Sequence, residues 1–301
     1  MKEIPKRIFI GFLVYSMISL VVSVVSFELF RRMEATEKLN THINNLFNKT
    51  VHAIKLGQDF MLYEIYQDTF FRTGHSVSLD KYEILLRGVD SIQKNIADIK
   101  NIQRGELYKE IIVLDNLMQS YDSIFKIIVR KETLRGFKDY GIIGKMKSNI
   151  KELEAEANIN VTDILLMRKY EKDYMINGDS ASILAHKTMY HTIDKNLLAN
   201  TKLLNQERKH LRTSLENYLN AFHQIIQLEG EIGHHRQVGL SIEMKEILLK
   251  IDQTVDKISM LAVQQKEGIN ATIKIVFLTI ITVSVLLILL MAIAFRYMTS
   301  F

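Results

Sequence analysis

The stretch Ile275–Phe295, IVFLTIITVSVLLILLMAIAF, decides the fold class together with a second such stretch at Ile8–Phe27, IFIGFLVYSMISLVVSVVSF. Each contains about 20 residues without a charge, the length that an α-helix needs to cross ~30 Å of hydrocarbon. Core helices of soluble proteins rarely lack charges over this length, so we interpret both stretches as membrane spans, at 8–28 and 275–295. The sequence therefore predicts a two-pass membrane protein.

The first apolar run also has the position of a secretory signal peptide. It is longer than the apolar part of such a peptide, which spans about 7–15 residues. It leads into the bulky segment Glu28–Arg32, which has no small-x-small cleavage site. We therefore expect an uncleaved anchor.

Basic residues set the expected orientation, because cytoplasmic flanks of membrane spans carry an excess of Lys and Arg. Those on the flanks that we place in the cytoplasm are Lys2, Lys6, Arg7 and Arg296. Arg31 and Arg32 oppose this orientation, but long domains translocate largely regardless of charge. We predict residues 1–7 and 296–301 in the cytoplasm and residues 29–274 outside the membrane.

The composition favours long helices and excludes several classes of protein. The chain has 301 residues with no Cys, 13 Gly and one Pro, and that proline is Pro5, so no obligatory helix breaker follows it. Without Cys there is no disulfide or thiolate site. The net charge of +5 is spread along the chain, so nucleic-acid binding is not expected. Because no catalytic, cofactor or metal motif occurs, we expect neither an enzyme nor a cofactor.

Between the two runs, apolar residues recur at helical spacing and predict a helical bundle. Breaks are predicted at 73–78, 101–105, 136–144, 177–180 and near 204, with a further glycine-rich region at 230–239. A chain that leaves and re-enters one membrane face makes an even number of crossings. We therefore predict six antiparallel segments, with 230–239 as a kink in a long last helix. Which of 136–144 and 230–239 turns and which bends stays open.

An internal repeat divides the outer segment, with repeat one at about 31–145 and repeat two at about 146–273. Four matches occur in the same order along the two halves. They pair Gln58–Met61 with Lys172–Met175, Gly74–Leu79 with Gly178–Ile183, Leu114–Tyr121 with Leu215–Phe222, and Gly141–Lys147 with Gly239–Lys245. Four colinear matches predict two related helical modules.

At this point the chain resembles a known family. The segments Gly141–Lys147 (GIIGKMK) and Arg168–Asp179 (RKYEKDYMINGD), set between two spans, are similar to the helical bimodular sensor domain. That domain occurs in bacterial transmembrane chemoreceptors (methyl-accepting chemotaxis proteins) and in sensor histidine kinases. The resemblance covers most of residues 31–273.

The resemblance implies two stacked four-helix bundles, a homodimer in the bacterial inner membrane, and a periplasmic site for a small ligand, often an organic acid. It also implies a cytoplasmic signalling domain, whereas this sequence stops at Phe301. Either the sequence is a fragment, or its output lies in another protein. The alternative is a membrane-anchored helical scaffold that binds partners and no small molecule.

Arg168 is the principal candidate for ligand binding. Its spacing from Val161, Ile164 and Leu165 places it toward the apolar side of its helix, where an unpaired guanidinium is costly. A guanidinium suits a carboxylate ligand, because its donors form a planar fork. Glu171, three residues on, offers an ion pair instead. Both interpretations stay open here.

Weaker candidates are Lys172, Arg208 and Arg236. The first two are proposed helpers of Arg168, although lone charges on helices are usually solvated. Arg236 follows His234 and His235 in a region of weak helical pattern. We expect an exposed loop there, with a pH-sensitive or anion-binding cluster as the alternative. Adjacent histidines chelate poorly on a helix, so no metal site is predicted.

Overall fold

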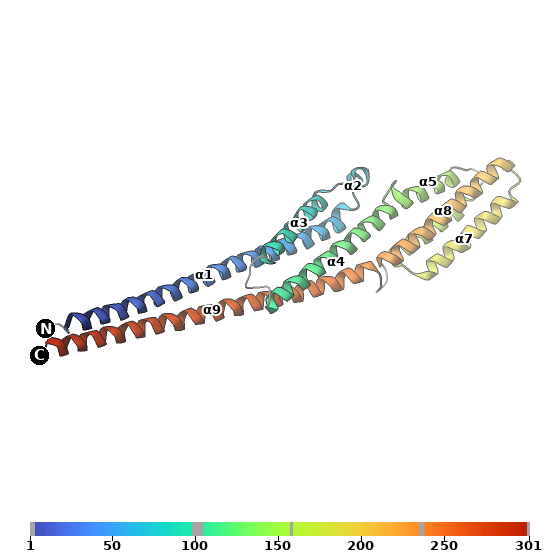
Figure 1. Cartoon of the computed structure of the whole chain (residues 1–301). Helices are drawn as coiled ribbons and strands as arrows, with labels where there is room; N and C mark the ends of the chain where they lie inside the picture. Colours follow the sequence, from blue (N-terminus) through green and yellow to red (C-terminus); the bar gives the residue numbers. More distant parts are fainter. Residues whose placement is uncertain (1–3, 98–104, 157–158, 235–237, 300–301) are drawn as a thin grey trace. The chain divides into compact units, whose positions relative to one another are not determined.

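The computed structural model describes residues 4–97, 105–156, 159–234 and 238–299, and these residues form helices without any strand. The all-α class predicted from the sequence is therefore confirmed. The helices are α1 (Ile4–Asp59), the π-helical turn η1 (Phe60–Glu64), α2 (Asp68–Thr73), α3 (Val77–Ala97), α4 (Glu106–Arg135), α5 (Gly141–Glu154), α6 (Val161–Asn177), α7 (Ser180–Ala199), α8 (Asn205–Ile232) and α9 (Leu240–Thr299) (Figure 1).

Helices α1 and α9 carry the two apolar runs, and both are long and apolar enough to cross a membrane. The apolar side chains along these runs are mostly exposed, as expected of a surface that faces lipid. The two runs lie side by side, since residues of α1 such as Val21 and Val25 line one groove together with Val276 and Ile280 of α9. By length and composition the chain thus has two candidate membrane-spanning helices.

The chain divides into two compact units, residues 1–48, 89–113 and 254–301 on one side and residues 49–88 and 114–253 on the other. The first unit contains both apolar runs. Outside these runs its core includes Leu39, Ile43, Leu46, Ile96 and Ile258. On its surface, Lys257 of α9 contacts Glu110 and Glu106 of α4 at 2.7 and 3.3 Å.

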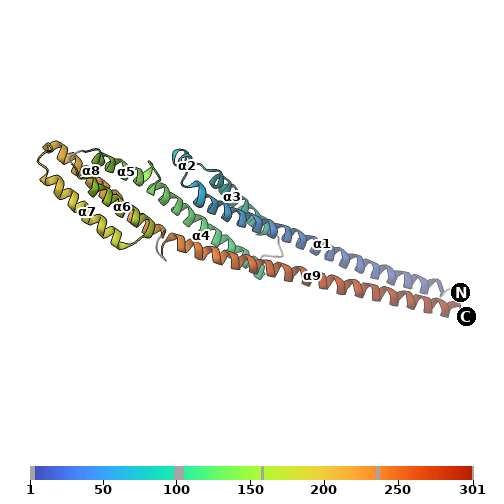
Figure 2. The same ribbon diagram turned by 180° about the vertical axis from the view of Figure 1, so that it is seen from behind.

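The second unit includes a four-helix core built by α5, α6, α7 and α8, here called the α5–α8 bundle. In it α5 packs against α8, and α6 packs against α7 (Figure 2). Its buried centre includes Met146, Met167, Tyr174, Leu215 and Phe222. Each side chain comes from a helix whose apolar residues recur at three- and four-residue spacing, which places them on one face.

Helices α4 and α8 repeat one buried pattern. In α4 it comprises Leu114, Met118, Tyr121, Phe125, Ile128 and Glu132, and in α8 it comprises Leu211, Leu215, Tyr218, Phe222, Ile225 and Glu229, each of them buried. Every member of the second set follows its counterpart by 97 residues. The sequence analysis paired Leu114 with Leu215, which differs from this spacing by one helical turn. We keep the names repeat one and repeat two for residues 31–145 and 146–273.

Each pattern ends in a left-handed glycine that breaks the helix. Gly136 (φ 85°) follows α4, and Gly233 (φ 92°) follows α8. Any side chain at either position would be strained at this φ, which explains why glycine occurs at both. We call the segments 136–140 and 233–239 the α4–α5 junction and the α8–α9 junction.

The α4–α5 junction is a bend, because α4 continues into α5 in the same general direction in both views (Figures 1 and 2). Of the two glycine-rich regions whose roles the sequence left open, 136–144 is therefore a bend. The chain instead reverses between α5 and α6, after Glu154 and before Val161, a turn that the sequence analysis missed. The breaks at 73–78, 177–180 and near 204 are confirmed. Most of the break predicted at 101–105 lies outside the described residues.

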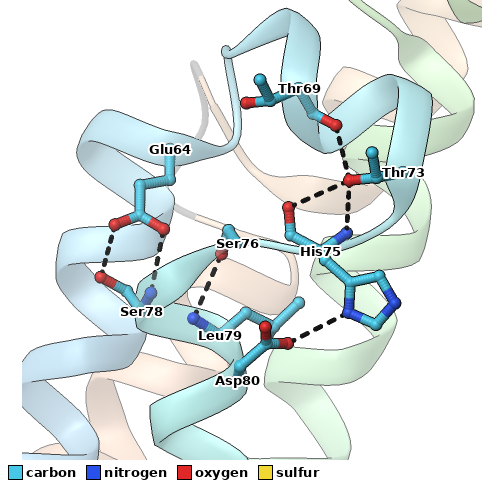
Figure 3. A network of polar contacts seen from close by, with 8 residues as sticks. All are labelled: Glu64, Thr69, Thr73, His75, Ser76, Ser78, Leu79 and Asp80. Carbon is cyan, nitrogen blue, oxygen red and sulfur yellow. Dashed lines mark hydrogen bonds and ion pairs between the residues drawn. The ribbon is translucent and has the colours of Figure 1, made fainter.

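Repeat one differs from repeat two by an insertion between Met61 and Gly74, which contains most of η1 and all of α2. Figure 3 shows how it is attached: the carboxylate of Glu64 accepts hydrogen bonds from the backbone N–H and the hydroxyl of Ser78, at 3.0 and 2.7 Å. In repeat two, Asp179 accepts the equivalent bonds from Ser182 at 2.7 and 2.8 Å. The start of α3 is thus capped by Glu64 from η1, whereas the start of α7 is capped by its own N-cap residue, Asp179.

Candidate functional site

A layer of polar side chains crosses the α5–α8 bundle at the middle of α6. The buried face of α6 consists of Ile164, Met167, Glu171 and Tyr174. Val161 and Leu165, which the sequence analysis placed on the apolar side with Arg168, are 44% and 54% exposed. Glu171, and not Arg168, is therefore the charged residue of α6 that faces the core.

Arg168 lies at the edge of this layer, half-buried. Its Nη1 donates to Oε1 of Glu154 on α5 at 2.5 Å, and the side chains are 31% and 27% exposed. The ion pair that the sequence suggested within α6 is thus made with another helix. Because both groups retain contact with water, the pair contributes about 1 kcal/mol or less.

Glu171, Tyr218 and His186 form a buried chain of hydrogen bonds. The hydroxyl of Tyr218 donates to Oε2 of Glu171 at 2.5 Å, and Nε2 of His186 lies 3.4 Å from the same hydroxyl. The His186 ring also packs on Phe222, with ring centroids 4.0 Å apart. These polar groups come from α6, α7 and α8, so they join three helices of the bundle.

Burial determines how these groups titrate. Desolvation raises the pKa of Glu171, although the hydrogen bond from Tyr218 and the charge of Arg168 oppose the shift. Desolvation also lowers the pKa of His186 to about 4, with a further contribution from His223. The pKa of Tyr218 is raised by desolvation and by Glu171. At neutral pH the imidazole is therefore neutral, and protonation is resisted by the apolar surroundings.

The other predicted residues do not join this layer. Lys172 is exposed on α6. Nη2 of Arg208 donates to the carbonyl oxygens of Asn200 and Leu203 at 2.7 and 3.2 Å, so this guanidinium holds the turn between α7 and α8. Arg236 lies outside the described residues.

The described residues of repeat one form no such layer at the matching place. The counterpart of Glu171 is Gly57, and a Cβ added there would lie 3.1 Å from the hydroxyl of Tyr121. The counterpart of His186 is Tyr82, which donates to Asp122 at 3.1 Å. The hydroxyl of Tyr121 thus occupies the space that a carboxylate takes in repeat two.

Sequence reasoning missed Glu154, His186 and Tyr218. Tyr218 could have been predicted from the spacing that α4 and α8 share. That spacing places a tyrosine, a phenylalanine and a glutamate of each helix in the core. Glu154 carries no such signal, since its contact with Arg168 depends on the turn after α5. Among the described residues, no group of three or more His, Cys, Asp and Glu is placed to hold a metal ion.

The ionisable groups of this layer are thus paired with one another inside and at the edge of a helical core. Comparison with protein families, with curated proteins and with solved structures finds no match to this chain.

Proposed function

We propose that the chain is the transmembrane input unit of a sensory receptor. The observation that supports this most is α9, one continuous helix from Leu240 to Thr299. It begins at the α8–α9 junction and contains the second apolar run near its other end. A displacement at the junction is therefore carried along a single helix toward the membrane. Residues 29–274 lie in the periplasm of a bacterial inner-membrane protein that forms two stacked bundles and a homodimer.

The ligand of this receptor is a small carboxylate that contacts the polar layer of the α5–α8 bundle. Arg168 supplies the fork of donors, and Lys172 or Arg208 assists from outside the layer. Arg168 is already paired with Glu154, so the carboxylate of the ligand replaces that of Glu154 as the partner of Arg168. That exchange releases Glu154 of α5 and changes the charge next to Glu171, which is bonded to α8 through Tyr218. Binding thereby favours one arrangement of these helices over another.

A titration with organic acids tests the ligand assignment. The full chain in lipid nanodiscs is titrated calorimetrically with a panel of mono- and dicarboxylic acids. Arg168→Ala should weaken binding about tenfold, the lower end for a charged hydrogen-bonded contact, because Glu154 competes. Arg212→Ala is the matched control, since Arg212 pairs with Asp194 at 2.7 Å on the same bundle. Equal affinities in the two variants would remove Arg168 from the site.

The topology has its own test. A reporter that is active only in the cytoplasm, fused after Phe301, should be active. Activity from a reporter that works only in the periplasm would contradict the orientation. Neither result depends on the ligand.

A membrane-anchored scaffold is the second candidate, and the exposed apolar side chains at the α6–α7 turn favour it. Ile176 is 72% exposed and Leu184 is 67% exposed, on adjacent helices of one unit. A scaffold would bind partners through such a surface and bind no acid. The titration distinguishes the two candidates, because only the receptor responds to it.

A further inference from the structure

The polar layer of the α5–α8 bundle holds a buried carboxyl one helical turn from the arginine at its edge. Glu171 follows Arg168 by three residues on α6 and is buried, whereas the Arg168 side chain is 31% exposed. Arg168 already contacts the carboxylate of Glu154 at 2.5 Å, and its charge also acts on Glu171. One guanidinium is therefore shared by an accessible carboxylate and a buried carboxyl.

A proton on Glu171 has a hydrogen-bond acceptor within reach. The hydroxyl of Tyr218 lies 2.5 Å from Oε2 of Glu171 and 3.4 Å from Nε2 of His186. Burial lowers the pKa of His186 to about 4, so near neutral pH its ring is uncharged, and with the proton on Nδ1 its Nε2 accepts. Once Glu171 is protonated, it can donate to Tyr218, and Tyr218 can donate to His186. The three groups thus satisfy one another with Glu171 ionised or neutral.

The other groups around Glu171 do not supply a buried counter-charge. The charged and titratable groups that act on it, directly or through a neighbour, are Glu154 of α5, Arg168 and Lys172 of α6, His186 of α7 and Tyr218 of α8. Lys172 is exposed, so water screens its charge. Burial and Glu171 raise the pKa of Tyr218, so its hydroxyl is neutral. His223 of α8 is exposed and acts on His186.

A ligand carboxylate at Arg168 changes this balance in two ways. Three carboxyl groups, those of the ligand, Glu154 and Glu171, then face the guanidinium of Arg168, so Glu171 meets an added like charge. The ligand also covers the edge of the layer and removes water from it. A like charge and the loss of water both disfavour an ionised carboxyl. Glu154, which is 27% exposed, can remain hydrated, whereas Glu171 cannot.

We propose that binding of a carboxylate at Arg168 is coupled to the uptake of one proton by Glu171. The proton comes from the solvent and forms an O–H bond on the Glu171 carboxyl, which becomes neutral. His186 is a positioning residue that accepts the hydrogen bond of Tyr218 in this state. Affinity therefore rises as the pH falls, and the receptor responds to an organic anion together with the acidity outside the membrane. This coupling rests on the proposed function, because it needs the acid site at Arg168.

Calorimetry counts the protons taken up. The full chain in nanodiscs is titrated with formate, glycolate, lactate and pyruvate between about pH 5.5 and 8, where these acids are ionised and release no proton of their own. The heat of binding is compared in two buffers that differ in ionisation enthalpy. We expect net uptake of about half a proton to one proton, and an affinity about tenfold higher at the lower pH, equivalent to one pKa unit between the free and bound states.

The outcome separates the coupling from the proposed function. If an acid binds with the same heat in both buffers, or with the same affinity at every pH, the coupling is refuted while the receptor assignment stands. If none of the acids binds, the ligand site of the proposed function fails and the coupling fails with it.

Two variants identify the group that takes the proton. Glu171→Gln is neutral at every pH and should bind the acid at pH 8 about tenfold more tightly than the unmodified chain, without proton uptake. His186→Phe keeps a ring but removes the acceptor, so proton uptake should decrease. Glu216→Gln, at an exposed glutamate of α8, is the matched control and should behave like the unmodified chain.

Circular dichroism checks that each variant folds. Proton uptake that persists in folded Glu171→Gln would assign the proton to another group and overturn the proposal. If Glu171→Gln does not fold, His186→Phe decides, because unchanged uptake in that variant would contradict the chain from Glu171 through Tyr218 to His186.

Discussion

The cores of the two repeats share an aromatic framework and differ in the groups that surround it. In repeat one, Tyr82 packs on Phe125 with ring centroids 4.7 Å apart, and in repeat two His186 packs on Phe222 at 4.0 Å. A buried tyrosine lies four residues before each of these phenylalanines, Tyr121 in α4 and Tyr218 in α8. The framework is therefore a property of the duplicated helix pair, and it does not by itself determine function.

What differs is whether the framework encloses a charge. Gly57 lets the hydroxyl of Tyr121 fill the core of repeat one, whereas Glu171 places a carboxyl beneath the hydroxyl of Tyr218 in repeat two. A buried carboxyl and a buried imidazole respond to charge nearby, and a phenol does so far less. Among the described residues, repeat two thus has a buried carboxyl and a buried imidazole at the places where repeat one has Gly57 and Tyr82.

The largest effect should be equal in the two repeats. Phe125→Ala and Phe222→Ala each remove a fully buried ring, so we expect each to lower the free energy of unfolding by about 3–5 kcal/mol. Denaturant unfolding of the full chain in detergent, followed by circular dichroism, measures both. A small loss in one variant alone would show that the two frameworks are not equivalent.

Acidification should affect repeat two before repeat one. The pKa of His186 is lowered to about 4 by desolvation, so the unfolded chain binds a proton between about pH 6.5 and 4 that the folded chain does not. Stability is therefore lost as the pH falls through this range, by about 3 kcal/mol at most. The raised pKa of Glu171 has the opposite sign: its contribution is present below the unfolded pKa and is lost as the pH rises.

Hydrogen exchange resolved by peptide measures this difference. On acidification, α6–α8 should lose protection before the segment of α4 that follows Leu114, and His186→Gln should reduce the difference. Tyr82, the counterpart in repeat one, carries no charge in this range. Equal loss of protection in the two segments would mean that His186 does not control the acid response.

Removing one tyrosine hydroxyl should lower the stability more in repeat two than in repeat one. Tyr218→Phe leaves the buried carboxyl of Glu171 without its donor, which costs about 1–3 kcal/mol. Tyr121→Phe is the matched change in repeat one, where the hydroxyl faces Gly57, and should cost less. Thermal melts of both variants give the comparison. If Tyr121→Phe is the more harmful change, the assignment of the polar layer to repeat two is mistaken.

The smallest effect concerns the ion pair at the edge of the layer. Arg168→Ala should lower stability by about 1 kcal/mol or less, and Glu154→Gln should cost no more in that background than alone. The double-mutant cycle gives their coupling. A coupling to Glu171 that exceeds the coupling to Glu154 would restore the pairing within α6 that the sequence suggested.

Much of the fold follows from the sequence because periodicity and apolar length are local properties. The two apolar runs, the helix class, the repeat and the breaks beside Gly74 and Gly178 all depend on neighbouring residues. The bend at Gly136 does not, because a glycine-rich break looks alike whether the chain bends or reverses. The turn after Glu154 does not either, because residues 155–160 contain neither Gly nor Pro. The structure separates them by showing where α5 packs.

The candidate site was predicted less well from the sequence than the fold. Arg168 was found, but its helix face was inferred from Val161 and Leu165, which proved exposed. Its partner lies on another helix, and such a contact depends on packing that spacing cannot supply. His186 and Tyr218 lie far apart along the chain and meet only because α7 and α8 are neighbours.

The most direct test of the sensory role measures whether an acid that enters the α5–α8 bundle changes α9. Hydrogen exchange of the full chain in nanodiscs is compared with and without each acid of the panel at a saturating concentration. We predict that at least one acid increases protection in α6 and α8 and also changes exchange in the first turns of α9 after Leu240, with both changes lost in Arg168→Ala and retained in Arg212→Ala. Exchange that no acid alters in either region, or protection in the bundle without any change in α9, would contradict the role in sensing.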